Sequence, residues 1–138
     1  MTLEEMRKIA NGNKASNKVR KKPDDEEHRI QCECIRAFRY KYPNMNHNLF
    51  AVPNGGKRNK IIAGKMKAEG ALAGVSDLIF LKSNRHYGAL LIEVKTPKGR
   101  QQQNQKEWER KIIQDGYKYV VIHSAEEMLK EIEAYLIE

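Results

Sequence analysis

The sequence predicts an α/β domain in which a small mixed β-sheet is flanked by α-helices. Helical patterns and short apolar segments alternate along the chain in the order helix, strand, loop-helix, strand, strand, helix, strand, helix. Two segments, Val75–Leu81 and Ala89–Val94, are apolar on both alternating faces, which is typical of strands buried on both sides. The length, 138 residues, suits one domain with a real core.

The first helix is expected to begin with Asp24 or Asp25 as its N-cap and to run to about Tyr42, because Pro43 cannot continue it. Its apolar residues recur at helical spacing and predict one buried face. That face comprises Ile30, Cys34, Ala37, Phe38 and Tyr42.

Later elements follow from the same patterns and from turn residues. We expect a strand at Leu49–Val52, a helical segment ending near Glu69, a helix at Gln101–Asp115, a strand at Tyr117–His123 and a last helix after Ser124. Gly116 is expected to stop a helix, and Ser124 with Glu127 to form a capping box.

Charge points to a polyanionic partner. Lys plus Arg total 26 against 18 Asp plus Glu, a formal net charge of +8. This excess is typical of nucleic-acid binders, although a ribosome-associated or membrane-surface protein would look similar. Residues 1–23 are expected to form a flexible basic arm that attracts phosphates, and residues 24–138 the folded domain.

The two cysteines, Cys32 and Cys34, lie one residue apart in the predicted helix and therefore on different sides of it. This spacing suits neither a disulfide nor a zinc site, so reduced thiols are expected. No apolar stretch approaches transmembrane length, and the N-terminus has no signal-like apolar region. We expect a cytoplasmic protein with no membrane partner.

Acidic residues occur where buried strands would not normally hold them. A hairpin centred near Arg85 places Asp77 opposite Glu93, and Lys95 on the same face as Glu93. Buried charges need partners or a metal, and one lysine neutralises only one of two acids. A divalent ion that prefers oxygen ligands, Mg²⁺ or Mn²⁺, would neutralise the remainder. The alternative is a structural ion-pair cluster at a sheet edge.

A glycine-rich turn precedes basic residues in the middle of the chain. Asn54, Gly55 and Gly56 follow Pro53, and Lys57 and Arg58 come next. Paired glycines allow a close approach of the backbone to a phosphate, with positive charge beside it. An ordinary surface loop with solvated charges would have the same composition.

Together these segments resemble the VRR-NUC family of the PD-(D/E)xK nuclease superfamily. The resemblance runs from about Glu27 to about His123. The matching residues are Glu27 and Gln31, the segment Phe50–Arg58, Asp77, the Glu93-Val94-Lys95 motif, and Gln105 with Trp108. Ser76 departs from the family pattern, which usually has proline before the aspartate.

The resemblance implies a restriction-endonuclease-like core and a metal-dependent DNA endonuclease, acting on structured or branched DNA such as four-way junctions. Asp77, Glu93 and the main-chain carbonyl of Val94 would then be ligands of Mg²⁺ or Mn²⁺. Lys95 would position water or stabilise the transition state. A non-cleaving DNA-binding module on the same scaffold is the alternative.

Further roles are implied for residues around this centre. Glu27 would complete an outer ligand set or aid a second metal, and Gln105 would orient Lys95 or the phosphate. The nucleic-acid backbone would be held by Asn54, Gly55, Gly56, Lys57, Arg58, Lys98 and Arg100. Small stand-alone members of the family resemble phage or viral proteins. A homodimer would suit a four-way junction, with Leu3, Met6 and Ile9 as candidates for its interface.

Overall fold

The computed structural model describes residues 2–6, 23–53 and 59–138. Residues 3–6 form a single helical turn, and most of the predicted basic arm lies outside the described residues. The elements that follow are α2 (Pro23–Lys41), the 3₁₀ turn η1 (Pro43–Met45), β1 (Leu49–Ala51), α3 (Lys60–Ala68), β2 (Leu78–Phe80), β3 (Leu90–Val94), α4 (Gln103–Gln114), β4 (Lys118–Ile122) and α5 (Ala125–Ile137). This is the predicted order and the predicted α/β class.

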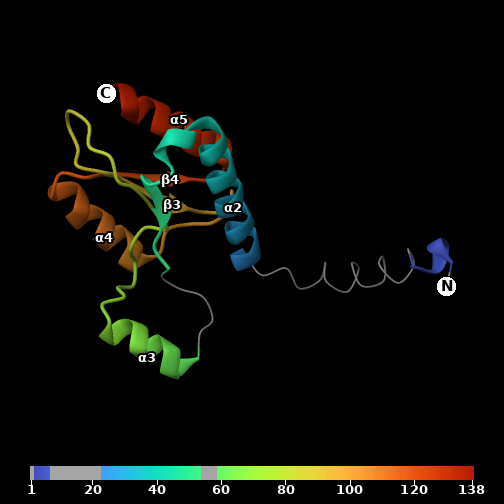
Figure 1. Cartoon of the computed structure of the whole chain (residues 1–138). Coiled ribbons are helices and arrows are strands. Elements are labelled where there is room, and N and C mark those ends of the chain that lie inside the picture. The colour runs from blue at the N-terminus through green and yellow to red at the C-terminus, as the bar shows by residue number, and fades with distance from the viewer. Residues whose placement is uncertain (1, 7–22, 54–58) are drawn as a thin grey trace.

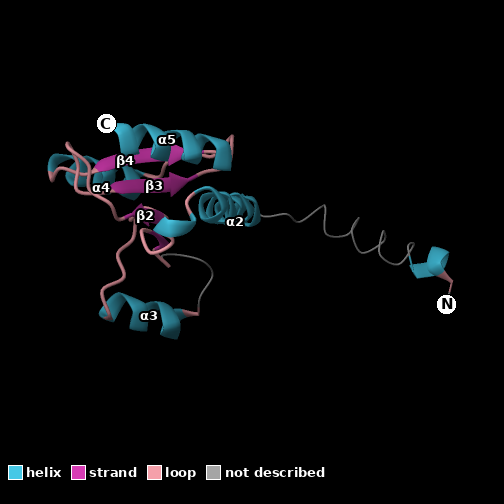
Figure 2. Cartoon of the chain, turned by 45° about the horizontal axis from the view of Figure 1, so that its top comes forward, coloured by secondary structure: helices cyan, strands magenta, loops and turns pink. Residues whose placement is uncertain are grey.

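The strands form one mixed sheet in the order β1-β2-β3-β4. β1 and β3 are both antiparallel to β2, whereas β3 and β4 run parallel, as their arrows show in Figure 2. The predicted hairpin register is confirmed, because Ile79 pairs with Leu91. Continuing this register by two residues sets Asp77 opposite Glu93.

Helices cover both faces of the sheet (Figure 1). α2 and α5 pack on one face and enclose the larger core, in which Phe38, Phe80 and Tyr135 stack edge to face. α4 covers the other face, where Trp108 and Tyr119 belong to a smaller cluster. Strand β3 is buried along its whole length because it lies between these two layers. A charged residue on β3 is therefore removed from water on both sides.

Helix α2 begins at Pro23, so the prediction of Asp24 or Asp25 as N-cap is wrong. Proline suits the first turn, where its missing N–H would have no helical partner. The helix ends before Pro43, as predicted. On the predicted buried face, Ile30, Cys34 and Phe38 are buried, whereas Ala37 and Tyr42 are half-buried; both cysteines are free thiols.

Strand β2 is shorter than the predicted Val75–Leu81 segment. Two side chains bond to the backbone just before it: the Ser76 hydroxyl donates to the Leu78 carbonyl at 3.2 Å, and the Asp77 carboxylate accepts from the Val94 N–H at 2.7 Å. Side-chain bonds of this kind compete with regular strand pairing. Regular strand pairing in β2 therefore starts only after Ser76 and Asp77.

The helix ends follow the predicted signals with one change. Gly116 ends α4 with φ +98°, a conformation that glycine adopts readily. Ser124 caps α5 by accepting from the Glu127 N–H, but the Glu127 carboxylate accepts from the N–H of His123 rather than that of Ser124. The His123 ring lies 3.2 Å from the same carboxylate, so this histidine has a surface partner.

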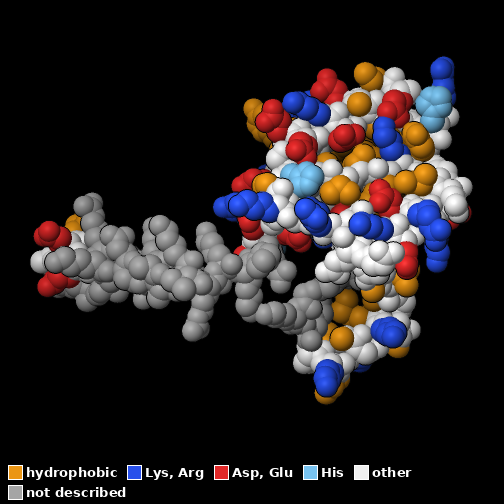
Figure 3. All heavy atoms as spheres, turned by 180° about the vertical axis from the view of Figure 1, so that it is seen from behind, with side chains coloured by type: hydrophobic (Ala, Val, Ile, Leu, Met, Phe, Trp, Pro, Cys, Tyr) orange, Lys and Arg blue, Asp and Glu red, His pale blue; other side chains and the backbone are white. Residues whose placement is uncertain are grey.

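Helix α3 lies apart from the sheet in both cartoon views (Figures 1 and 2). Asn59 caps it by accepting from the Ile62 N–H at 2.8 Å, and none of its side chains is buried. Figure 3 shows lysines and apolar side chains together on this helix, and basic and acidic side chains intermingled over the rest of that face. In the described part of the chain, no helix is both long enough and apolar enough to cross a membrane.

Candidate active site

Asp77 immediately precedes β2, and hydrogen bonds to its side chain and to its main chain fix its position. Its side-chain Oδ2 accepts from the Val94 N–H, and its main-chain carbonyl accepts from the Val52 N–H at 2.9 Å. The residue is half-buried. These bonds tie the β1–β2 connection to the end of β3, so the carboxylate has a fixed place beside the Glu93-Val94-Lys95 motif.

Glu93 lies within β3 and is completely buried. Its Oε1 accepts from the Tyr119 hydroxyl at 2.7 Å and from the Gln101 amide at 3.4 Å. Its Oε2 is the one buried side-chain oxygen or nitrogen, among the residues described, with no hydrogen-bond partner. A buried charged oxygen without a partner is costly, so its presence requires an explanation.

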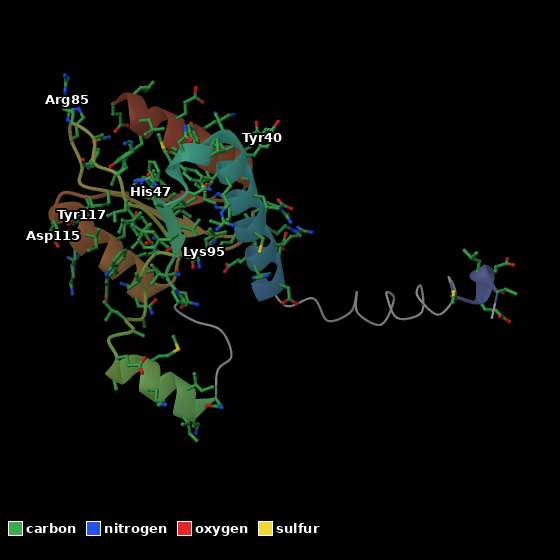
Figure 4. All side chains as sticks on the ribbon, in the orientation of Figure 1. Tyr40, His47, Arg85, Lys95, Asp115 and Tyr117 are labelled. Carbon is green, nitrogen blue, oxygen red and sulfur yellow. The ribbon has the colours of Figure 1, made fainter. Side chains whose placement is uncertain are left out.

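Lys95 lies two residues after Glu93, just beyond the end of β3, and is 7% exposed. Its Nζ lies 3.9 Å from Oε1 of Glu27, near the start of α2. Figure 4 places Lys95 between the ribbons of α2 and α4, with Arg85 at the far end of the hairpin. The hairpin turn therefore points away from the site, and the site lies at the open end of the hairpin.

Burial dominates the electrostatics of the two acids. It raises the pKa of Glu93, and the hydrogen bond from Tyr119 and the charge of Lys95 only partly oppose this rise. Burial also raises the pKa of Asp77, against the Val94 N–H bond and the Lys95 charge. The one lysine does not compensate both carboxylates, which is the imbalance that the sequence predicted.

The donor set fits a hard divalent cation. Asp77 and Glu93 lie opposite each other at the same end of the hairpin. Oε2 of Glu93 makes no hydrogen bond and could therefore coordinate a cation. Neither this site nor any other part of the described chain brings together three or more His, Cys, Asp or Glu side chains that could hold a metal ion. Main-chain oxygen and water would therefore have to complete the coordination, and the carbonyl of Val94 stays the predicted candidate.

Two other predicted residues lie on the helices around this centre. Glu27 is half-buried and contacts Lys95, which joins α2 to the site. Gln105 is also half-buried, and its side-chain oxygen accepts from the Gln102 N–H at 2.7 Å, where it caps α4. This bond gives Gln105 a structural task, and its predicted action on Lys95 or phosphate stays a prediction.

The predicted phosphate-binding residues are only partly visible. Lys98 and Arg100 are exposed in the loop between β3 and α4, directly after the Glu93-Val94-Lys95 motif. Asn54, Gly55, Gly56, Lys57 and Arg58 lie outside the described residues.

Sequence reasoning missed Tyr119, Gln101 and Glu109. The sequence pattern assigns Tyr119 only to a strand and Gln101 only to the start of a helix. Gln101 also donates to Glu109 on α4 at 3.0 Å, so it bridges two carboxylates. No local spacing connects these residues to Glu93. Tyr119 is brought to Glu93 by the parallel pairing of β3 with β4, and the sequence pattern does not specify that pairing.

Fold and site together define an α/β domain with two acids and a lysine at the open end of a hairpin. The VRR-NUC domain model matches residues 21–126, and the chain therefore belongs to the VRR-NUC domain family. A solved structure, a "VRR_NUC domain protein", matches with a TM-score of 0.67 and 24% identity, over 80% of this chain and 87% of that one. At this identity the likeness shows the fold. No curated protein matches.

Proposed function

We propose that this protein is a divalent-metal-dependent endonuclease that hydrolyses DNA phosphodiester bonds, with structured or branched DNA as its substrate. Membership of a nuclease-type family supports DNA as the substrate class. The net charge of +8 and the exposed Lys98 and Arg100, which follow Lys95 by three and five residues, support contacts with a phosphate backbone.

The observation that carries the proposal is the partnerless Oε2 of the fully buried Glu93. A purely structural ion-pair cluster would be expected to satisfy both oxygens, since an unpaired buried oxygen of a charged group costs free energy. The nearby lysine is paired instead with Glu27. An unsatisfied ligand oxygen next to a second carboxylate favours cation binding over a structural role.

In the proposed reaction, Asp77 and Glu93 would hold Mg²⁺ or Mn²⁺. A bound ion of this kind would supply positive charge at the scissile phosphate and lower the pKa of a coordinated water. Lys95 stands on the same face with its side chain nearly excluded from solvent, where its ammonium would stabilise the charge that develops on the phosphoryl oxygens. Lys98 and Arg100 would hold neighbouring phosphates without selecting sequence.

The test is a substrate panel with purified protein. Linear, nicked, flapped and four-way DNA are incubated with Mg²⁺ or Mn²⁺, and with a chelator as control. Wild-type protein is expected to cut branched DNA in a metal-dependent way. Glu93→Gln and Lys95→Met are expected to lose cleavage by at least about 100-fold while they still bind DNA.

Matched control substitutions are available on α5. Glu133→Gln and Lys130→Met make the same chemical changes at exposed positions, where Glu133 pairs with Lys41 and Lys130 with Glu126. Both are expected to cut like wild type. Absence of metal-dependent products on every substrate would refute the nuclease, and binding without cutting would favour the non-cleaving module. Preference for linear DNA would refute the branched substrate alone.

The homodimer remains part of this proposal. Two active sites would be needed for symmetric cleavage of a four-way junction. Light scattering of the full chain and of a chain lacking residues 1–22 tests the idea that the N-terminal segment carries the interface. A monomer mass for the full chain removes the dimer, and an equal dimer mass for both chains removes the N-terminal interface.

A further inference from the structure

Tyr119 is fixed in place independently of the acids. It lies on β4, opposite Leu91 in the parallel β3–β4 pairing, two residues before the partner of Glu93. It is 8% exposed, and its ring meets Trp108 of α4 edge to face, with centroids 5.9 Å apart. The sheet fixes the backbone of Tyr119, and the indole fixes its ring. The hydroxyl is therefore a donor at a defined point beside Glu93.

The tyrosine engages only one of the two carboxylate oxygens. Its hydroxyl donates to Glu93 Oε1 at 2.7 Å, and Gln101 adds a longer bond to the same oxygen. Burial, and then the bond to Glu93, raise the pKa of Tyr119, so its hydroxyl keeps the proton that it donates. With both donors on Oε1, the other oxygen is left without a partner.

We propose that Tyr119, assisted by Gln101, is a positioning residue that orients Glu93 so that Oε2 is presented to the divalent cation. This inference rests on the proposed function. Tyr119 does not touch metal or substrate; it acts through Glu93. Donors that hold a ligating carboxylate in one rotamer reduce the freedom lost on metal binding, and removing such partners typically weakens metal affinity about 10- to 100-fold.

Gln101 links this contact to α4. Its amide donates to both Glu93 Oε1 and Glu109 Oε2. The bond to Glu109 therefore fixes the amide group that contacts Glu93. Gln101 itself is half-buried, and its bond to Glu93, at 3.4 Å, is near the long limit of hydrogen-bond geometry. Tyr119 is therefore expected to contribute more to the orientation than Gln101.

The test measures binding of Mn²⁺ alone to the full-length protein by calorimetry, in the absence of DNA. Tyr119→Phe keeps the ring against Trp108 and removes only the hydroxyl. We expect it to weaken Mn²⁺ binding about tenfold or more. Gln101→Met is expected to weaken it about two- to threefold, because it removes the longer bond.

Tyr135→Phe is the matched control. Tyr135 is also buried, but in the larger core on the opposite face of the sheet, and its hydroxyl donates to the Lys82 carbonyl. Both phenylalanine variants lose one buried hydroxyl, so their losses in thermal stability should be comparable. Only Tyr119→Phe is expected to change the affinity for Mn²⁺, which separates orientation of Glu93 from general destabilisation.

The outcomes distinguish this inference from the proposed function. If the wild type binds Mn²⁺ and Tyr119→Phe binds it equally well, the positioning role is refuted while the metal site stands. If Tyr119→Phe does not fold, Gln101→Met decides, and an unchanged affinity in that variant refutes the role. If the wild type itself binds no Mn²⁺, the proposed metal site is refuted and the positioning role with it.

Discussion

The carboxylate of Asp77 accepts a hydrogen bond from the backbone N–H of Val94 at 2.7 Å. Val94 has no partner in β2, which pairs only with Leu90–Ile92. A side chain therefore satisfies a donor that the sheet leaves unpaired on this side. The bond places Asp77 next to the Glu93-Val94-Lys95 motif and gives it a structural role beside its proposed metal-binding role.

These two roles of Asp77 can be separated by two substitutions. Asp77→Asn retains an oxygen that can accept from Val94, so it should keep most of the stability and lose cleavage. Asp77→Ala leaves a buried N–H unpaired and should also lower the free energy of unfolding by about 1–3 kcal/mol. Urea unfolding and cleavage assays check this. Equal stability of the two variants would show that the bond contributes nothing to the fold.

Glu93 should make the stability of the metal-free protein depend on pH. Its pKa is raised in the folded state, mainly by burial. A carboxyl of this kind adds stability that is fully present below its unfolded pKa and is lost as pH rises through its folded pKa. Glu93→Gln cannot lose a proton there. Its stability relative to wild type should therefore increase as the pH rises above about 4, the usual pKa range of a glutamate in an unfolded chain.

Thermal unfolding of both proteins in chelator measures this difference. Added Mn²⁺ should reverse it, because binding to the folded state stabilises only the protein that keeps the ligand. A stability difference that stays constant over this pH range would show that Glu93 does not titrate as its buried position requires.

Lys98 and Arg100 should contribute to DNA affinity without contributing to sequence choice. Both are exposed just after the motif. Replacing either by alanine should weaken binding to all sequences alike and reduce the slope of log K against log salt by about 0.9. DNA titrations over a salt series, with Lys130→Ala as the control, give the slopes. An unchanged slope would place the DNA on another surface.

Gly74 should be sensitive to substitution because it contacts the start of α4. Its φ is +89°, and an added Cβ would lie 2.7 Å from the Asn104 carbonyl oxygen. Gly70 is the matched control, with φ +107° and no atom within 4 Å of an added Cβ.

Both Gly→Ala changes strain the backbone, but only Gly74→Ala adds a clash. We expect it to lower the free energy of unfolding by about 1–3 kcal/mol more than Gly70→Ala. Because Asp77 follows closely, cleavage should fall too. Chemical denaturation of the two variants gives the comparison, and equal losses would mean that the clash is relieved without cost.

Some features of the site could be predicted from the sequence because they depend on local periodicity. The turn after β2 and the two-residue repeat of strands set Ile79 opposite Leu91, and the confirmed register carries Asp77 to Glu93. The N-cap of α2 could not be identified in this way, because Pro23 and two aspartates all suit a first helical turn. The start of β2 could not be predicted either, since side-chain bonds made by Ser76 and Asp77 replace regular strand pairing just before it.

By itself, the sequence determined the α/β class, the hairpin register and the grouping of two acids and a lysine at one end of that hairpin. Strand periodicity and a short turn suffice for this, because both act between near neighbours. Only the tertiary structure decided which oxygen of Glu93 is engaged. Tyr119 is 26 residues from Glu93 and reaches it through the parallel pairing of β3 with β4. Such a contact depends on how distant segments pack, which no local pattern encodes.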